Sequence, residues 1–319
     1  MSVSREHRFG RRRGFDRFTI QVVPEEKADR QKGAPITLRT RWFTPDPVIG
    51  LLEVANMAHY KGSQAYIAFW RDNWSTVEGS AVVIGPGLAV TALHVLDELM
   101  PEIVQGKLNL MLIAPTPDGG RAWRIRNVTR VGGTDLAILS LGLGSRMPRQ
   151  RKLDCLRLCA VPPKVGDLVM ISGFRAAEDV VKADEGVYFP ASETSIKHGM
   201  RLWRGVGIVQ PNSQHHSLCI QVDVRSLGGM SGGAAFNSKG ECFGILSSSI
   251  DHEDGAGTSR IHLLWPSFIT NFPDQLVNPG NTTILLDHVG VDIIGREWLV
   301  VEELLSGVKT VRFKTAIEM

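Results

Sequence analysis

Short apolar runs recur along most of the chain, and glycine or proline separates one run from the next. The runs are rich in β-branched residues, which is typical of short strands joined by turns rather than of alternating strands and helices. We therefore expect a mainly β protein, built as a sandwich or a barrel. The predicted strands cover residues 64–70, 79–85, 108–114, 135–141, 166–174, 218–224 and 242–249.

One connection between strands has the composition of a hairpin turn. The sequence NSKGE at residues 237–241 is polar and separates two apolar runs. Glycine adopts positive φ at no steric cost, so Gly240 suits the tight part of this turn. The pattern predicts two neighbouring strands joined through residues 237–241.

Helical periodicity is convincing in two places. Apolar residues recur at helical spacing between Val48 and Met57, with Pro47 near the start, and again over residues 93–100. The strand-rich body then lies between an N-terminal extension, residues 1–58, and a C-terminal extension, residues 273–319. We expect the N-terminal helix to pack on the body, because its apolar face would otherwise be exposed.

Composition narrows the class of protein. The 319 residues are 43% hydrophobic, which is enough for one large domain or two small ones with their own cores. No run approaches the roughly 18 consecutive apolar residues of a membrane span, and the start of the chain lacks the apolar core of a secretory signal. Four cysteines are too few for disulfide bonds to stabilise a chain of this size. We expect a soluble cytoplasmic protein with reduced thiols and no membrane contact.

Charge does not point to nucleic acid. The formal net charge is only +3, although arginines cluster near the N-terminus. One hypothesis gives this cluster a nucleic-acid-binding role, and it predicts an affinity that falls steeply with salt. Nothing in the strand-rich body supports that role, so we do not expect a nucleic-acid partner. The clustered arginines are Arg5, Arg8, Arg11, Arg12, Arg13 and Arg17.

Three residues have the types and surroundings needed for nucleophilic catalysis. A catalytic serine needs a base to take its proton and a carboxylate to orient that base. His94 follows a predicted strand in TALHVL, Asp135 stands at the head of a strand in GGTDLAILSL, and Ser231 lies in a glycine-bracketed turn. We predict that His94, Asp135 and Ser231 converge as general base, orienting acid and nucleophile.

The glycines around Ser231 favour a rigid backbone rather than a flexible loop. In SLGGMSGGAAF, residues 226–236, glycine removes the side chains that would obstruct unusual backbone angles. Such a turn directs the amides of Gly229, Met230 and Ser231 to one side, where they form an oxyanion hole. We expect the substrate carbonyl oxygen against the Gly229 and Ser231 amides.

These motifs resemble the chymotrypsin-fold (trypsin-like) serine peptidases. The resemblance covers roughly residues 62–272 and is nearest to the cysteine-poor bacterial high-temperature-requirement type. The motifs follow one another in the family's order: VEGSAVVIGPGLAVTALHV, VGDLVMISGF, IQVDVRSLGGMSGGAAFNSKGECFGI and IHLLWPSFI. The resemblance implies two six-stranded antiparallel β-barrels, residues 59–150 with His94 and Asp135 and residues 151–272 with Ser231.

The same resemblance assigns supporting residues. Ser247 takes the place of the family serine that hydrogen-bonds the triad carboxylate, and Ser248 and Ser249 lie on the strand that pairs with extended substrate. The resemblance also implies a polypeptide substrate and no cofactor. The implied walls of the substrate pocket are Arg225, Ser226, Leu227, Gly228 and the strand from Leu246 to Ser249.

The chain also departs from the family. Met230 and Arg225 stand where trypsin has aspartates. We therefore expect neither activation by a new N-terminus nor cleavage after Lys or Arg. The residues after Phe272 are too few for a trailing peptide-binding domain. We expect an outward Arg225 and cleavage mainly after small or aliphatic residues; an inward Arg225 would instead pair with Asp or Glu of the substrate.

Other interpretations stay open at this point. Asp97 or Asp118 could replace Asp135 as the orienting carboxylate, and the whole domain could be a catalytically silent binding or scaffold module in a bacterial defence or signalling system. A protein partner could bind through either extension. A metal site is disfavoured, because its candidate ligands lack paired short spacings. Those candidates are His198, His215, His216, Cys155, Cys159, Cys219 and Cys242.

Overall fold

The computed structural model describes most of the chain between residues 51 and 314. Among these residues, no helix is both long and apolar enough to cross a membrane. The described ranges are 51–54, 60–71, 74–105, 109–117, 119–143, 154–176, 182–183, 186–190, 200–211, 218–251, 257–274, 279–303 and 309–314.

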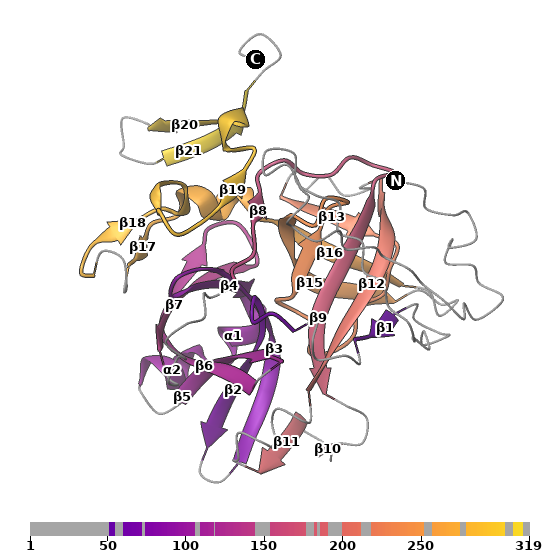
Figure 1. Cartoon of the computed structure of the whole chain (residues 1–319), viewed down its shortest axis with the longest axis vertical. Helices are drawn as coiled ribbons and strands as arrows, with labels where there is room; N and C mark the ends of the chain where they lie inside the picture. Colours follow the sequence, from indigo (N-terminus) through magenta and orange to yellow (C-terminus); the bar gives the residue numbers. More distant parts are fainter. Residues whose placement is uncertain are drawn as a thin grey trace, which may run out of the picture.

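Strands β2 to β7 of the first sheet form a closed barrel, drawn in purple and magenta in Figure 1. The strand order of the sheet is β10-β11-β3-β2-β5-β6-β7-β4, and pairing of β3 with β4 closes a ring of six antiparallel strands, β2 to β7. This confirms the first predicted barrel. The strands are β2 Gln64–Arg71, β3 Trp74–Gly85, β4 Leu88–Ala92, β5 Asn109–Thr116, β6 Gly119–Val131, β7 Leu136–Leu143, β10 Lys182–Ala183 and β11 Gly186–Pro190.

The second sheet has nine strands in the order β14-β9-β12-β13-β16-β15-β8-β19, with β1 added beside β12. Strand β14 pairs with both β9 and β15, and β8 pairs in parallel with β15 and β19. The prediction of a second six-stranded antiparallel barrel is therefore confirmed only in part. The strands are β1 Leu51–Glu53, β8 Leu158–Cys159, β9 Leu168–Ala176, β12 Met200–Gln210, β13 Cys219–Val222, β14 Ala234–Phe236, β15 Cys242–Asp251, β16 Gly257–Leu263 and β19 Ile293–Ile294.

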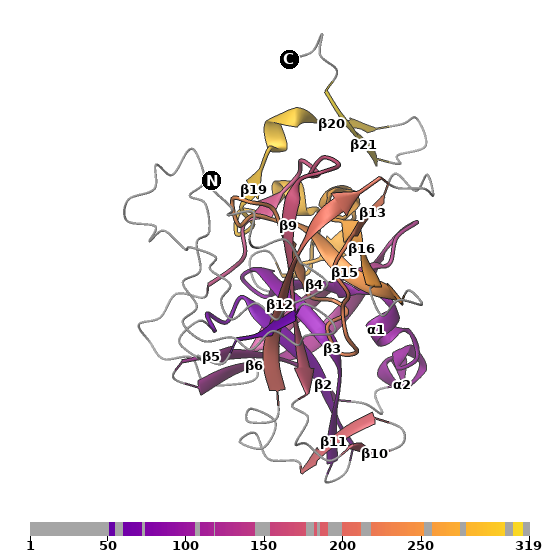
Figure 2. The ribbon, with the colours of Figure 1, turned by 90° about the vertical axis from the view of Figure 1, so that its right-hand side faces the viewer.

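Helical and C-terminal elements complete the fold. Figures 1 and 2 both place the last two strands, β20 and β21, beyond one end of the two sheets. The protein is thus mostly β rather than all β. These elements are α1 His94–Asp97, α2 Met100–Val104, the 3-10 helices η4 Trp265–Ile269, η5 Leu285–Asp287 and η6 Arg296–Trp298, and strands β17 Phe272–Pro273, β18 Thr282–Thr283, β20 Leu299–Glu303 and β21 Lys309–Phe313.

The two sheets pack against each other through apolar side chains. Strand β4 is buried along its whole length, and its Val90 belongs to the same buried cluster as Ala234 and Ile245 of the second sheet. Strand β16 alternates buried and half-buried residues, as a strand with one face on the core does. The groups described below as the candidate site lie where the sheets meet.

The predicted N-terminal helix is wrong over its described part. Residues Leu51–Glu53 form strand β1, which pairs antiparallel with β12 and buries Leu51 completely. A short apolar run does not distinguish a helix from a buried strand by its spacing alone. Here the run pairs with the free edge of β12 and therefore forms a strand. The preceding residues and residues 55–59 lie outside the described residues.

The C-terminal residues are an integral part of the fold. Leu285 is fully buried in the cluster shared by the two sheets, and β19 adds to β8. Phe313 packs edge-to-face on Trp265, with ring centroids 6.1 Å apart. The described C-terminal residues therefore pack into the core of the protein rather than forming a separate extension.

Candidate active site

His94 and Asp135 are brought together by the pairing of two strands. Strand β4 ends at Ala92, which lies opposite Leu136 of β7, so the residues that follow β4 and precede β7 are neighbours. The main-chain N–H of Leu93 donates to the Asp135 carbonyl at 3.1 Å. His94 then begins α1, and Asp135 stands directly before β7.

A carboxylate and an imidazole meet at this point in two hydrogen bonds. The His94 main-chain N–H donates to Asp135 Oδ1 at 2.9 Å, and His94 Nδ1 lies 2.7 Å from Asp135 Oδ2. The first bond fixes the carboxylate, and the second fixes the plane of the ring. Because Nδ1 faces the carboxylate, Nε2 is the ring nitrogen that is free to accept or donate a proton on the other side of the ring.

The electrostatics of the pair favour an ionised Asp135 beside a more basic His94. The hydrogen bond to Asp135 raises the pKa of His94, burial opposes it, and the Asp135 and Asp97 charges add to the rise. Burial raises the pKa of Asp135, but hydrogen bonds from His94 and Ser247 outweigh burial and leave that pKa lowered. The arrangement suits a histidine that accepts a proton and is then stabilised as imidazolium.

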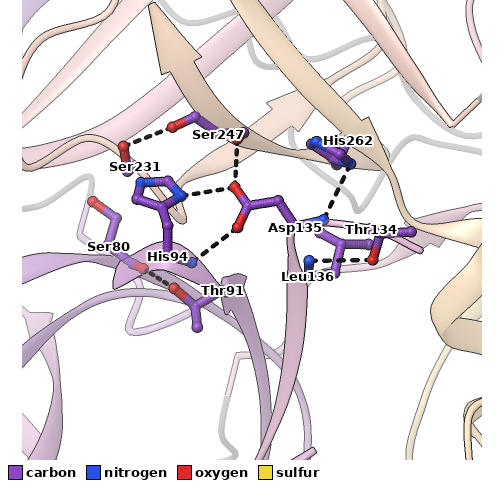
Figure 3. A network of polar contacts seen from close by, with 9 residues as sticks. All are labelled: Ser80, Thr91, His94, Thr134, Asp135, Leu136, Ser231, Ser247 and His262. Carbon is purple, nitrogen blue, oxygen red and sulfur yellow. Dashed lines mark hydrogen bonds and ion pairs between the residues drawn. The ribbon is translucent and has the colours of Figure 1, made fainter. Parts of the chain in front are cut away.

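Two residues of the second sheet complete the surroundings of Asp135 (Figure 3). Ser247 Oγ donates to Asp135 Oδ2 at 2.5 Å, and His262 Nδ1 accepts from the Asp135 main-chain N–H at 3.4 Å. The predicted Ser247 contact is therefore present. Asp135 belongs to the first barrel, so these bonds fix it against the second sheet.

The turn that carries Ser231 is built on glycines, as its sequence predicts. Gly229 and Gly232 have φ of 88° and 84°, angles that side chains resist. A Cβ on Gly232 would lie 2.0 Å from the Ser80 carbonyl oxygen, and a Cβ on Gly233 would lie 2.2 Å from that of Ser172. Glycine is thus required both for backbone angle and for close approach.

The amides of the turn differ in what they bind. The Met230 N–H donates to the Leu227 carbonyl at 3.0 Å, so the expectation that it joins the oxyanion hole needs correction. Among the described residues, the amides of Gly229 and Ser231 have no hydrogen-bond partner. Two donors, rather than three, remain for a developing oxyanion.

Ser231 itself is linked to the Asp135 carboxylate through Ser247. Ser231 Oγ donates to the Ser247 carbonyl at 2.8 Å, and no hydrogen bond joins it to His94 in the part of the chain described. In Figure 3 the imidazole of His94 lies between the side chains of Ser231 and Asp135. Rotation about the Cα–Cβ bond of Ser231 is the change that would redirect Oγ, and such bonds often tighten only when substrate binds.

The residues expected to contact substrate fall into different environments. Leu246 is fully buried, and its N–H and carbonyl bind Gly233 and Gly232 of the Ser231 turn, so it supports the turn instead. Ser226 is buried and Leu227 half-buried, whereas a Cβ on Gly228 would meet no atom within 4 Å. These positions lie directly before the turn.

The remaining expected contacts lie along β15 and beside its partner strand. Ser248 and Ser249 are half-buried, and Ser249 Oγ donates to the Thr258 carbonyl at 3.5 Å. Arg225 is half-buried, and its Cγ would lie 2.9 Å from a Cβ on Gly257. The stem of Arg225 therefore packs against the start of β16.

Three residues that contribute hydrogen bonds to the candidate site were not expected from the sequence. Ser80 binds both the Ser231 turn and β9, Thr91 donates to the Ser80 carbonyl at 2.7 Å, and His262 accepts from Asp135. Ser80 lies inside the recognised motif VEGSAVVIG, which was the available signal. Thr91 and His262 sit in ordinary strands, and nothing in their spacing marks them.

The cysteines are free thiols in unreactive surroundings. Burial is the main cause that raises the pKa of Cys155 and Cys159 to about 11 and that of Cys242 to about 12. No group of three metal-ligating side chains occurs among the residues described. His198, His215 and His216 lie outside those residues.

A comparison with protein-family models agrees with the motifs at the level of the family. Residues 79–245, just over half of the chain, match a family model described as trypsin-like peptidase domain. A solved structure, described as neuropsin, a serine protease expressed in the limbic system of mouse brain, is 12% identical and has a TM-score of 0.44. That match covers 67% of this chain and 94% of the other. A comparison with curated proteins found no match.

Proposed function

Since the chain belongs to the family of trypsin-like peptidase domains, we propose that it is a serine endopeptidase. His94 is the general base, Asp135 orients it and Ser231 is the nucleophile. The observation that carries the proposal is the His94–Asp135 pair, joined by bonds of 2.9 Å and 2.7 Å at the position where Ser247 connects Asp135 to Ser231.

The proposed reaction begins with rotation of Ser231 Oγ from the Ser247 carbonyl toward His94. His94 Nε2 takes the hydroxyl proton while Oγ attacks the substrate carbonyl carbon. Asp135 remains ionised and stabilises the imidazolium, which agrees with its lowered pKa. The same proton then passes to the leaving amine, and water hydrolyses the acyl-enzyme by the reverse sequence.

The oxyanion is assigned to two main-chain donors. The amides of Gly229 and Ser231 have no partner among the described residues, and an amide without a partner is ready to meet a developing negative charge. Extended substrate would add to β15 at Ser248 and Ser249. We also propose that the second sheet corresponds to the second barrel of the chymotrypsin-like fold, with β1, β8 and β19 as additions.

Cleavage preference is proposed from the residues before the turn. Arg225, Ser226, Leu227 and Gly228 offer no carboxylate to a basic side chain, so we propose cleavage mainly after small or aliphatic residues. Strong cleavage after Asp or Glu that is lost in Arg225→Ala would show instead that the guanidinium pairs with substrate. Free thiols support a cytoplasmic location as a further proposal.

One observation favours a second candidate function. Because Ser231 Oγ donates to the Ser247 carbonyl rather than to His94, the domain could be a catalytically silent binding module. Digestion of a proteome-derived peptide library separates the two. The peptidase proposal predicts that the full chain cleaves the peptides and that Ser231→Ala does not. Equally low cleavage by both proteins would favour the silent binding module.

A further inference from the structure

Ser80 lies at the centre of a hydrogen-bond network between the two sheets. It is on β3 and only 1% exposed, yet it makes four hydrogen bonds to other described residues. Figure 3 shows its position below Ser231 and beside Thr91. Its N–H donates to the Ser231 carbonyl at 2.7 Å, and its carbonyl accepts from Thr91 Oγ1 at 2.7 Å. Both of these bonds use main-chain atoms of Ser80 and would survive loss of its side chain.

The Ser80 hydroxyl makes the other two bonds. It accepts from the Phe174 main-chain N–H at 2.7 Å and donates to the Gly229 carbonyl at 2.9 Å. Phe174 is on β9, so one hydroxyl joins the first barrel to both β9 and the nucleophile turn. A hydroxyl that donates and accepts in this way has both of its main capacities used.

The bond to Gly229 holds one particular peptide unit. The unit between Gly229 and Met230 has its N–H bound to the Leu227 carbonyl at 3.0 Å and its carbonyl bound to Ser80 Oγ. A peptide unit is planar, so two bonds at opposite ends fix its orientation. Gly229 next to it keeps φ at 88°, and the adjoining amides of Gly229 and Ser231 are the proposed oxyanion donors.

We propose that Ser80 is a positioning residue whose hydroxyl holds the nucleophile turn with the Gly229 and Ser231 amides directed at the oxyanion. The inference rests on the proposed function for its kinetic consequence. Its structural consequence, a turn held by the hydroxyl, does not depend on catalysis.

A matched control comes from Ser140 on β7. Ser140 is fully buried, and its Oγ donates to the Pro273 carbonyl at 2.8 Å, on the part of the first barrel that faces the C-terminal segment. Ser80→Ala and Ser140→Ala therefore remove the same atom from equally buried serines. A merely structural role for Ser80 predicts the same behaviour for both variants.

The test compares steady-state kinetics and amide hydrogen exchange of the two variants. Ser80→Ala should lower kcat by about 10- to 100-fold with KM within about 2-fold, because donors to the oxyanion act mainly in the transition state. The acid limb of the kcat/KM–pH profile of Ser80→Ala should match the wild type, since the substitution leaves the His94–Asp135 pair in place. Residues 226–233 should exchange faster in Ser80→Ala alone. Ser140→Ala should keep the wild-type kcat per folded molecule.

The outcomes separate the inference from the proposed function. If the wild type cleaves nothing, the peptidase proposal fails, and exchange over residues 226–233 alone decides the role of Ser80. Unchanged exchange in Ser80→Ala, an equal fall of kcat in both variants, or a loss seen in KM rather than kcat would overturn the inference.

Discussion

The two halves of the candidate site are held in place by different means. His94 and Asp135, from the first barrel, are held by side-chain hydrogen bonds of a carboxylate, and the His94 side chain is 46% exposed. The Ser231 turn, from the second sheet, is held by main-chain bonds, by the Ser80 hydroxyl on the Gly229 carbonyl and by glycines that admit close neighbours. The first half depends on charge and pH, whereas the second depends on space and backbone angle.

This difference determines how each half should fail. Removing charge from Asp135 leaves the backbone intact and changes only the protonation and orientation of His94. Adding a single methyl group within the turn should disturb the backbone while leaving charge unchanged. Ser247 belongs to both halves, because its side chain binds Asp135 and its carbonyl binds Ser231.

The largest effect is expected in the charged half. Asp135→Asn should lower kcat by about 10⁴-fold while the fold is kept, because a neutral amide leaves His94 in the wrong tautomer. Steady-state kinetics and circular dichroism measure the two quantities. Asp97→Asn is the control, since Asp97 pairs with Arg130 at 2.7 Å and does not touch the ring of His94. Comparable losses in both variants would transfer the orienting role to Asp97.

The next effect is expected in the turn. Gly232→Ala should cost about 3 kcal/mol or more in the free energy of unfolding, because its Cβ would overlap the Ser80 carbonyl oxygen and Thr91 Oγ1, at 2.0 Å and 2.3 Å. Gly133→Ala has a similar φ of 73° but meets no atom within 4 Å, so it should cost only about 1 kcal/mol. Urea unfolding of both variants checks this, and equal losses would rule out the overlap.

A smaller effect is expected where the halves meet. Ser247→Ala should lower kcat by about 10-fold, since a hydrogen bond to a charged group contributes about 1.5 kcal/mol. Ser267→Ala, which removes another buried hydroxyl, bound to the Leu264 carbonyl, should leave kcat within about 2-fold. Initial-rate kinetics distinguish them, and an undiminished kcat in Ser247→Ala would remove Ser247 from the site.

The smallest effect is a shift in pH dependence. The base must be neutral, so kcat/KM should rise as pH passes the pKa of His94. The hydrogen bond to Asp135, together with the negative charges of Asp135 and Asp97, raises that pKa above its ordinary 6.5. Asp97→Asn removes a charge that favours imidazolium, so the acid limb should move to slightly lower pH. Measuring kcat/KM of the wild type and Asp97→Asn between about pH 5 and pH 9 tests this. A shift of the acid limb to higher pH in Asp97→Asn would contradict the prediction.

Local patterns predicted most strands and the glycine turn around Ser231. Apolar runs indicated most strands of both sheets, and NSKGE predicted the β14–β15 hairpin, in which Gly240 has a φ of 79°. Strands β6 and β12 were missed because arginine and glycine interrupt their apolar pattern. The helix expected at Val48–Met57 failed because tertiary pairing with β12 overrides a short periodic signal.

The site was predictable in its residue types but not in its contacts. Glycine spacing marks the Ser231 turn, because the same residues that allow its backbone angles are adjacent in sequence. His94 and Asp135 are 41 positions apart, and only the pairing of β4 with β7 joins them. The engaged Met230 amide, the buried Leu246 and the central Ser80 all depend on contacts between the sheets, which spacing along the chain does not encode.

The central claim is that Ser231 is a nucleophile activated by His94 and Asp135. Labelling of the folded chain with an active-site fluorophosphonate, followed by peptide mapping, tests this most directly. The account predicts a single label on Ser231, no label in Ser231→Ala and slow labelling in Asp135→Asn. A folded wild-type protein that stays unlabelled, or that carries its label on another residue, would contradict it.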